Sequence, residues 1–385
     1  MRVLVVGGGV AGLATARGLT AAGHEVRVFE RAPQLRATGG AVTLWSNGIG
    51  VLDAFGVDLD GAGRSIDSFE AWRDDGRPIW NIDVARIRRR LGYGALTIPR
   101  FRLVERLAAT LPDGVVELGR DVTSIEADDD AVRVHFADGT SAAGDVAIGA
   151  DGYRSVVRRL LIGDEARPTG WVTWQGLFAT DHPLAAGNVG VNVIGRGGVC
   201  GLLPAGAGLL QWWFELRAST SDEIALEPVE MLRKRFGSWR SPVPEIVDQI
   251  TEAEAFPHVR HRVPQVWGGL RSTLVGDAAH VMPPALAQGA NQSLEDAWVL
   301  ATTLKADDVT AGLRSYERAR RRRVAAVSRL ATIATTQQER PWSRVSRLPS
   351  RPLTTIYGLA LRSASMLLSS PVEQRAGWKP AEPPR

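Results

Sequence analysis

The stretch RVLVVGGGVAGLATARGLTAAGHEVRVFE, residues 2–30, predicts a strand–turn–helix–strand unit and decides the fold class. Residues 3–6 are apolar and β-branched, as is typical of a buried parallel strand. A glycine-rich turn follows, then a run of small helix-compatible residues, and residues 26–30 form a second apolar strand with an acidic end. Because the glycines stand between a strand and a helix, they indicate a dinucleotide-binding unit of an α/β fold.

The three glycines of the pattern G-x-G-x-x-G have separate physical roles. Gly7 permits the tight turn, Gly9 lets a pyrophosphate approach the backbone, and Gly12 lets the helix pack closely on the strand. The helix N-terminus offers free N–H groups and positive partial charge to the phosphates. Glu30 is expected to hold ribose hydroxyls. The unit therefore predicts an ADP-containing cofactor, and these residues leave open which one.

Length and composition bound the remaining possibilities. The chain has 385 residues, which suits about two domains, and 44% hydrophobic with 23% charged residues is ordinary for a soluble globular protein. No segment has ~20 uninterrupted apolar residues, so we expect no stable membrane insertion. Because the dinucleotide unit starts at residue 2, we expect no secretory leader and a cytoplasmic location. The single cysteine, Cys200, excludes an intrachain disulfide, and the oligomeric state stays open.

Two short arginine runs raise the question of nucleic-acid binding. The net charge is +4 and the isoelectric point is about 9.6. Residues 88–90 and 320–323 are all arginine. Both runs are short and lack interleaved aromatic residues, so we interpret them as solvated helix faces and expect no nucleic-acid partner.

The order of the expected elements implies a discontinuous arrangement. A strand over 41–45 leads into a helix that begins at Ser46 or Asn47, another helix begins at Arg100, and an apolar strand over 145–149 rejoins the first sheet. We expect a Rossmann-like cofactor domain, an inserted antiparallel-sheet substrate domain, and C-terminal helices that end in a frayed tail. The cofactor domain is expected over 1–65, 99–165 and 270–335, the substrate domain over 66–98 and 166–269, the helical extension over 336–385, and the frayed tail over 377–385.

Two further motifs follow predicted strands. GADGYRSVVR (residues 149–158) ends an apolar strand in Asp-Gly and continues into a helix that carries Arg154 and Arg158. LVGDAAHVMPPALAQGANQSLED (residues 274–296) ends a strand in Gly-Asp, passes a proline-stiffened loop and enters a helix. Asp277 could accept a hydrogen bond from a polyol, and the helix start presents positive potential. Asp-Gly by itself is compatible with a simple turn.

Taken together in this order, the three motifs resemble those of class A flavoprotein monooxygenases, the p-hydroxybenzoate hydroxylase family, nearest its salicylate- and urate-hydroxylase-like members. The resemblance covers roughly residues 1–330. It implies that the cofactor is FAD, gripped along its whole length. The FAD-contacting positions that it implies are Gly7, Gly9, Val10, Ala11, Gly12, Glu30, Arg31, Arg100, Val122, Asp151, Gly152, Gly276, Asp277, Pro284, Gly289, Ala290 and Asn291.

The resemblance also implies a reaction. NADH or NADPH reduces FAD, O2 adds to give a C4a-hydroperoxyflavin, and one oxygen atom is transferred to an electron-rich carbon by hydroxylation or epoxidation. The family lacks a second glycine fingerprint for the nicotinamide nucleotide, and so does this chain. The helix that begins near Gly289 would stabilise reduced flavin, and the apolar proline loop would slow the loss of peroxide.

The substrate is predicted to be an apolar aromatic or polycyclic compound. The urate enzymes place an arginine, a tyrosine and an aspartate around their substrate, and the matching positions here are Val199, Gln211 and Ala285. In an alternating strand only one of Trp212 and Trp213 can face the cavity, and some of the aromatic residues could be ordinary sheet core. The expected pocket consists of Trp45, Trp174, Phe178, Val199, Gln211, Trp213 and Pro283.

No residue is assigned as catalytic, and His280 is only a weak candidate because it follows the Gly-Asp motif. His258 and His261 are expected at the surface or in hydrogen bonds, since no spacing suggests a metal site. The adjacent pair Glu295-Asp296 is expected to cap or pack rather than to exchange protons.

Three other functions compete with the monooxygenase. A flavin-dependent halogenase needs a lysine near its substrate, and the lysines here are Lys234, Lys305 and Lys379, none of them suitably placed. An FAD-bound cyclase or isomerase without net redox chemistry would take up no oxygen. A nucleic-acid binder would show salt-dependent affinity.

Overall fold

The computed structural model describes residues 1–35, 39–217, 227–305, 307–337 and 349–370. The expected frayed tail over 377–385 and part of the expected helical extension lie outside the described residues. Among the helices of the described part, none is long and apolar enough to cross a bilayer.

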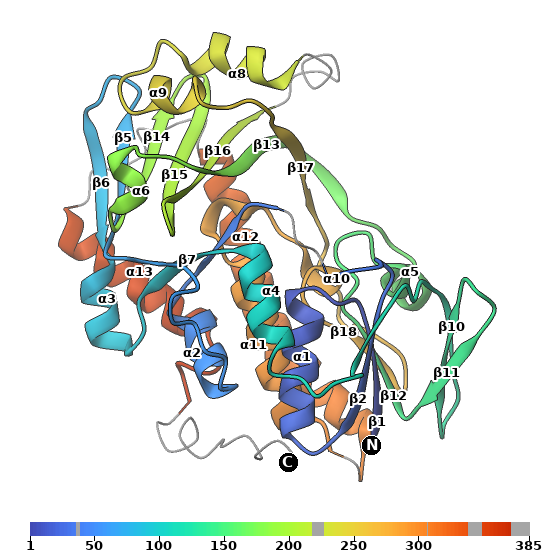
Figure 1. The fold of residues 1–385 in the computed structure, drawn as a ribbon. Coiled ribbons are helices and arrows are strands. Elements are labelled where there is room, and N and C mark those ends of the chain that lie inside the picture. Colours follow the sequence, from blue (N-terminus) through green and yellow to red (C-terminus); the bar gives the residue numbers. More distant parts are fainter. Residues whose placement is uncertain (36–38, 218–226, 306, 338–348, 371–385) are drawn as a thin grey trace.

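A five-stranded parallel sheet forms one part of the molecule (Figure 1). Its order is β18-β12-β1-β2-β8, so the first strand is central and its residues 3–6 are buried. Burial on both faces explains why that stretch is uniformly apolar. The strand expected over 145–149 does rejoin this sheet, as β12. The strands are β1 (Arg2–Val6), β2 (Glu25–Glu30), β8 (Val116–Leu118), β12 (Val146–Gly149) and β18 (Ser272–Leu274).

Helices from distant parts of the sequence pack together beside this sheet. Figure 1 shows α1, α4 and α11 side by side, and α1 makes close contact with α11. A Cβ on Gly18 of α1 would lie 3.1 Å from the Ala301 Cβ, so the small residue permits this approach. The helices of this part are α1 (Val10–Ala21), α2 (Ser46–Ala54), α4 (Arg100–Ala108), α5 (Val156–Ile162), α10 (Asp277–His280), η1 (Pro284–Leu286), α11 (Gly289–Thr303) and α12 (Val309–Gln337).

A seven-stranded sheet forms the second part, with order β17-β13-β16-β15-β14-β5-β6. It is antiparallel as expected, except that β5 and β14 run parallel, because they come from separate segments of the chain. Helices α6 (Pro183–Ala186), α8 (Pro228–Phe236) and α9 (Val243–Val247) cover one face. The strands are β5 (Ser68–Arg73), β6 (Pro78–Asp83), β13 (Arg167–Ala179), β14 (Val189–Gly195), β15 (Gly198–Gly206), β16 (Leu209–Arg217) and β17 (Glu254–Arg260).

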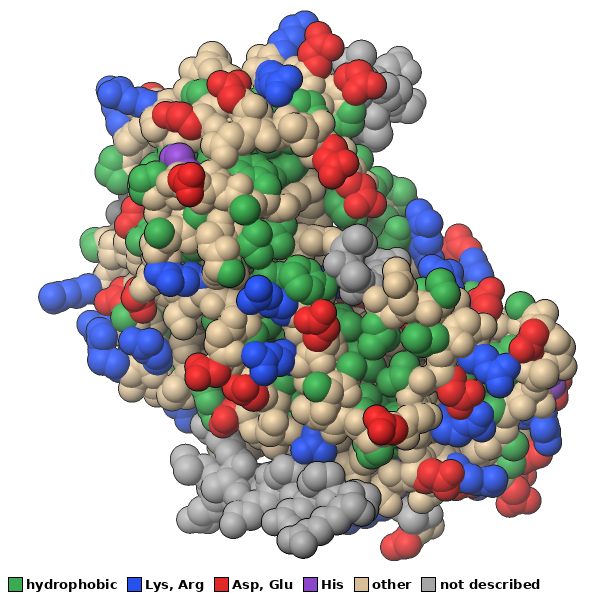
Figure 2. Space-filling model, in the orientation of Figure 1, with side chains coloured by type: hydrophobic (Ala, Val, Ile, Leu, Met, Phe, Trp, Pro, Cys, Tyr) green, Lys and Arg blue, Asp and Glu red, His purple; other side chains and the backbone are tan. Residues whose placement is uncertain are grey.

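Two small antiparallel sheets and two helices complete the described structure. Helices α3 (Val84–Leu91) and α13 (Ser350–Ala364) lie beneath the seven-stranded sheet in Figure 1. On the face in Figure 2, hydrophobic side chains are visible across the middle, where the two main parts meet. The small sheets consist of β3 (Ala41–Leu44), β4 (Arg64–Ile66) and β7 (Ala95–Pro99), and of β9 (Val122–Ala127), β10 (Val132–Phe136) and β11 (Ser141–Gly144).

Arg158 ties three separate segments together. Its side chain is 1% exposed, forms an ion pair with Asp164, and donates to the backbone carbonyls of Ala278, Ala279 and Arg262. A buried guanidinium is tolerated only when its donors are satisfied in this way. Arg158 thereby fixes α10, the segment that follows the Gly-Asp motif, against α5.

We expect Arg158→Ala to lower the free energy of unfolding by about 3 kcal/mol, because it leaves several buried carbonyls without donors. The measurement is urea unfolding followed by tryptophan fluorescence. The matched control is Arg159→Ala, since Arg159 is exposed on the same helix and forms a surface ion pair with Glu165 at 3.6 Å. Equal losses of unfolding free energy in the two variants would contradict the role of Arg158 in tying these segments together.

Candidate cofactor and substrate site

The turn between β1 and α1 is shaped by glycines. Gly7 has φ +109°, and a Cβ on it would lie 2.5 Å from the carbonyl oxygen of Ala150. A Cβ on Gly12 would lie 1.8 Å from the Gly7 carbonyl oxygen. Gly9, in contrast, has no atom of the described residues within 4 Å of its Cβ position, and no described side chain caps the helix that it precedes. The turn therefore leaves open space at an uncapped helix N-terminus, which suits a phosphate group.

The Gly-Asp motif lies directly beside this turn and beside the start of α11. A Cβ on Gly276 would lie 2.8 Å from both the Ala11 Cβ and the Ser293 Oγ, and its φ is +59°. The Asp277 Oδ1 lies 3.8 Å from the Cβ position of Gly289, the first residue of α11. Among the described residues, no hydrogen bond ends on the Asp277 carboxylate. Two motifs distant in sequence thus converge, with one acidic acceptor available to a ligand.

The Asp-Gly motif is used differently. The Asp151 carboxylate accepts hydrogen bonds from the Ser155 hydroxyl and from the backbone N–H groups of Val156 and Val157, at 2.7 and 3.2 Å. Burial raises the pKa of the Asp151 carboxyl above its usual range, and these hydrogen bonds oppose that shift. The side chain predicted to contact the cofactor therefore caps α5, while Gly152 (φ +79°) provides the turn.

The remaining predicted cofactor residues outside these motifs are Glu30, Arg31, Arg100 and Val122. Both oxygens of Glu30 accept backbone hydrogen bonds, from Gly8 at 2.7 Å and from Ala32 at 3.0 Å, and unused lone pairs remain for a ribose. Arg31 is exposed, and Arg100 starts α4 with its N–H bonded to the Gly40 carbonyl at 3.0 Å. Val122 is 5% exposed and packs in the main core, so its side chain is not free for a ligand.

The loop before α11 is held by the side chain of Asn291. Its Oδ1 accepts from the Trp45 N–H at 2.8 Å, and its amide donates to the carbonyls of Thr43 and Ala287 at 3.0 and 2.7 Å. Ala287 has φ +49°, a strained value for a residue with a Cβ. Pro283 is buried and Pro284 is exposed. The Asn291 amide is thus committed to the protein, whereas the first-turn backbone N–H groups of α11 and the Nε2 of its N-cap residue, Gln288, have no side-chain acceptor among the described residues.

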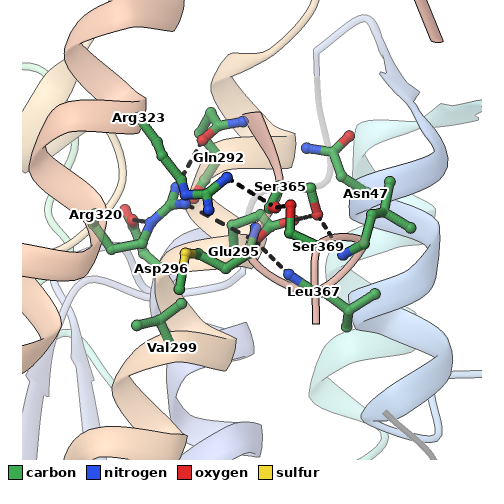
Figure 3. Close-up of polar contacts among 12 residues, drawn as sticks. Asn47, Gln292, Glu295, Asp296, Val299, Arg320, Arg323, Ser365, Leu367 and Ser369 are labelled. Atoms are coloured by element: carbon green, nitrogen blue, oxygen red, sulfur yellow. Dashed lines mark hydrogen bonds and ion pairs between the residues drawn. The ribbon is translucent and has the colours of Figure 1, made fainter. Parts of the chain in front are cut away.

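A buried ionic network stands behind the Gly-Asp motif (Figure 3). The Asp296 Oδ2 accepts from the Gly276 N–H at 2.8 Å and lies 2.6 Å from the His280 Nε2, and its Oδ1 accepts from Arg320 at 2.7 Å. Burial opposes ionisation of Asp296, but His280 and Arg320 outweigh it and hold its pKa below the usual range. His280 therefore links the motif to α11, and the solvated face expected at residue 320 is wrong, because Arg320 is 0% exposed.

The predicted substrate residues fall on opposite faces of the seven-stranded sheet. Trp174 and Phe178 pack with Trp212 under α8 and α9. Trp45 and Trp213 belong to a cluster on the other face, which also contains Phe69, Leu203, Ala287 and Tyr357. We call this second group the junction cluster. As the alternation predicted, Trp212 and Trp213 lie on opposite faces, and Trp174 and Phe178 lie on the face opposite the junction cluster.

The other predicted pocket residues lie on the face of the junction cluster. Val199 is paired with Glu215, and Gln211 with Leu203. The Gln211 Oε1 accepts from the Ala41 N–H, so its amide ties the sheet to the strand that leads to Trp45. Residues 203, 211, 213 and 215 alternate onto one side, as the pleat requires.

His258 and His261 are both buried, so the surface alternative is wrong, while the hydrogen-bonding alternative holds for His258. His258 is 5% exposed, with its Nε2 2.7 Å from the Thr173 Oγ1 and its Nδ1 3.6 Å from the Glu215 Oε1. Burial lowers the pKa of His258 and of His261 to about 4. Within the described ranges, no group of three or more His, Cys, Asp or Glu side chains could hold a metal ion.

Comparison with known proteins decides the cofactor. The family model described as "FAD binding domain" matches residues 1–331. The chain belongs to this FAD-binding family. The fit agrees with the geometry, since Gly9 leaves space at an uncapped helix start and the Asp277 carboxylate is available. The predicted α/β fold with a Rossmann-like FAD-binding part and an inserted sheet is confirmed, and so is FAD as the cofactor.

Individual members of the FAD-binding family extend the comparison. The 3-amino-4-hydroxybenzoate 2-monooxygenase of Streptomyces cremeus is 36% identical over 341 residues, covering 86% of each chain. The FAD-dependent urate hydroxylase of Klebsiella oxytoca is 31% identical over 344 residues, covering 84% of this chain and 87% of that protein. The crystal structure of Klebsiella pneumoniae HpxO with FAD and uric acid superposes with a TM-score of 0.81 at 25% sequence identity. The match covers 98% of this chain and 95% of HpxO. The predicted FAD-dependent monooxygenase is thereby confirmed.

Asp277→Ala is expected to reduce FAD retention about tenfold while the protein stays folded, because it removes the free carboxylate beside the α11 N-terminus. Flavin content after gel filtration, from absorbance at about 450 nm, measures this, and Asp113→Ala on an exposed loop is the control. Undiminished flavin content would contradict the role of Asp277.

Acidification is expected to destabilise the protein through its buried histidines. The folded-state pKa of His258, about 4, is below its ordinary value of 6.5, so the stability that neutral His258 contributes is complete above pH 6.5. It is lost as the pH falls from 6.5 towards 4, by about 3 kcal/mol. His258→Gln should flatten the dependence of the unfolding free energy on pH. The flattening should be incomplete, because His261 titrates in the same range. Parallel curves for both proteins would contradict this assignment.

Proposed function

We propose that this FAD-dependent monooxygenase uses NADH or NADPH and O2 to hydroxylate or epoxidise an electron-rich aromatic ring bound against the junction cluster. The observation that carries the proposal is the direct connection between this cluster and the loop at the flavin site. Asn291, in the first turn of α11, accepts a hydrogen bond from the backbone of Trp45, the aromatic residue at the centre of the cluster. A ring bound at the edge of this cluster would therefore lie close to the loop that carries Asn291.

The chain's own residues would bind, orient and exclude water. Bound FAD would supply the reduction by nicotinamide and the activation of oxygen that no protein side chain can provide. The first-turn N–H groups of α11 present positive potential, which would stabilise the negative charge of a reduced flavin bound there. Pro283, Ala287 and the junction cluster offer few proton donors, which favours a dry reaction site.

The nature of the side chains argues for a substrate of low polarity. Val199 cannot form an ion pair, and the side-chain carbonyl oxygen of Gln211 already accepts a hydrogen bond from the Ala41 N–H. Both positions match polar substrate ligands in the urate enzymes by the resemblance described above. An aromatic or polycyclic compound made electron-rich by a hydroxyl or amino group fits this surface, and the activity named for the Streptomyces relative also concerns an aminophenol ring.

We also propose the domain limits expected from the sequence, because sheet membership supports them. Strands β5 and β6, from the segment 66–98, belong to the same sheet as the strands of 166–269. We retain a cytoplasmic location for the enzyme, since Cys200 is buried and unpaired, as is common in reducing compartments.

A screen of aromatic compounds tests the proposed function. Neutral phenols, indoles and naphthols should stimulate NADH or NADPH oxidation and O2 uptake about tenfold over the basal rate, a difference of about 1.4 kcal/mol in barrier. Urate should stimulate far less, because Val199 is uncharged and the Gln211 Oε1 is already bonded to the Ala41 N–H, so neither side chain can pair with its charge. Mass spectrometry with labelled O2 should find one added oxygen atom in the product. A clear preference for urate, or turnover of an aromatic compound without nicotinamide oxidation, would contradict the proposal.

A further inference from the structure

Helix α13 bridges the two main parts of the molecule, beneath the seven-stranded sheet in Figure 1. At its N-terminal end, the buried Thr354 accepts a hydrogen bond through its Oγ1 from the Asp83 N–H at 3.0 Å. Asp83 ends β6 and caps α3, so this contact fixes α13 to the sheet. The family model that identifies the chain ends at residue 331, before this helix.

The other end of α13 is held by the FAD-binding part (Figure 3). Glu295, on α11, accepts from the Ser365 hydroxyl through Oε1 and from the Met366 N–H at 2.8 Å through Oε2. Arg323 of α12 donates to the Ser365 carbonyl at 3.2 Å. Glu295 and Ser365 are both 0% exposed, so this connection is shielded from water. The helix is thus anchored at both ends, to different parts of the protein.

The face of α13 between these anchors contributes to the junction cluster. Leu353, Tyr357 and Leu361 recur every four residues and all belong to the cluster. The ring centroid of Tyr357 lies 4.9 Å from that of Trp45. Since Asn291 holds the backbone of Trp45, Tyr357 lies one side chain away from the loop at the flavin site.

The aromatic ring of Tyr357 packs against the junction cluster, and the side chain as a whole is half-buried. Among the described residues, none forms a hydrogen bond with its hydroxyl, and burial raises the pKa of this group. A phenol hydroxyl at the edge of an apolar cluster can hydrogen-bond a ligand as well as water. Tyr357 therefore offers a polar group, on the α13 face, to an aromatic ligand.

We propose that α13 forms a wall of the substrate cavity, and that the Tyr357 hydroxyl hydrogen-bonds a hydroxyl or amino substituent of the aromatic substrate. This inference rests on the proposed function. It makes Tyr357 a specificity residue that selects among apolar rings by one polar group. The Glu295–Ser365 contact then acts as the positioning contact that keeps this wall in place.

Binding of two probes to the full-length holoenzyme tests the inference. 2-Naphthol and naphthalene share a ring system and differ by one hydroxyl, and each is titrated by the change in flavin absorbance. The unmodified enzyme should bind 2-naphthol about tenfold more tightly than naphthalene, the preference that one hydrogen bond gives. Tyr357→Phe should lose this preference without losing FAD, while Tyr153→Phe, which alters an exposed tyrosine, should keep it.

Two further measurements separate the parts of the inference. Hydrogen–deuterium exchange of α13 amides should slow when 2-naphthol binds, if the helix is a wall of the cavity. Ser365→Ala should weaken the binding of both probes alike, about threefold, because it loosens the wall without touching the hydroxyl.

The outcomes distinguish the two proposals. If neither probe perturbs the flavin of the unmodified enzyme, the proposed substrate class is wrong. If both bind but Tyr357→Phe behaves as Tyr153→Phe does, or α13 exchange is unchanged, the role of Tyr357 is wrong while the proposed function stands.

Discussion

The buried carboxylate of Asp296 is the constraint on which the cofactor site depends. It joins the Gly276 N–H and His280 on one side to Arg320 on the other, and Asp296, His280 and Arg320 are 0% exposed. Such an ion pair adds little net stability, since desolvation offsets most of the attraction. Removing one partner, however, leaves the other charged and unpaired. The arrangement therefore works mainly as a positioning device that gives the Gly-Asp backbone a single conformation.

Helix α11 extends this constraint to the substrate side. Glu295 and Asp296 are consecutive, so their side chains leave the helix in different directions. Asp296 holds the segment below the flavin site, and Glu295 holds the turn after α13. Arg320 lies between them, with its Nη1 3.9 Å from the Glu295 Oε2. One helix thus fixes, through two adjacent carboxylates, both the cofactor loop and the helix that we place at the substrate.

Local patterns in the sequence predicted the parts of the fold that depend on neighbours in the chain. The glycine turn, the helix start at Arg100 and the alternation at Trp212 and Trp213 need only local geometry. The face of the sheet that meets the cofactor could not be predicted, because helices or strands cover both faces and both are apolar. The capping role of Asp151 had a local signal, since a carboxylate shortly before Ser155 and a helix can accept its free N–H groups.

The burial of Arg320 could have been predicted from the helical spacing of the apolar residues around it, although the run of four arginines suggested a solvated face. Leu313, Tyr316, Arg320, Val324 and Val327 follow the helical spacing of three and four residues, and all five are buried. Arg320 occupies an apolar stripe, so its charge needed a buried partner, and Asp296 is the acid that lies opposite. Tyr357 offered no comparable signal, because its position depends on how α13 docks between two parts of the protein.

The structure separates the residues that we expect at FAD from those that we propose at the substrate. At the expected cofactor site, glycines and the backbone N–H groups of helix starts shape the surface, and a Cβ on Gly7 or Gly12 would collide with the turn itself. At the junction cluster, the surface is made by side chains on one sheet face and on α13. Those side chains can change in size or polarity without moving the turn or the ionic network. Proteins with this arrangement can keep the same cofactor while their substrate changes, because cofactor binding and substrate selection depend on different residues.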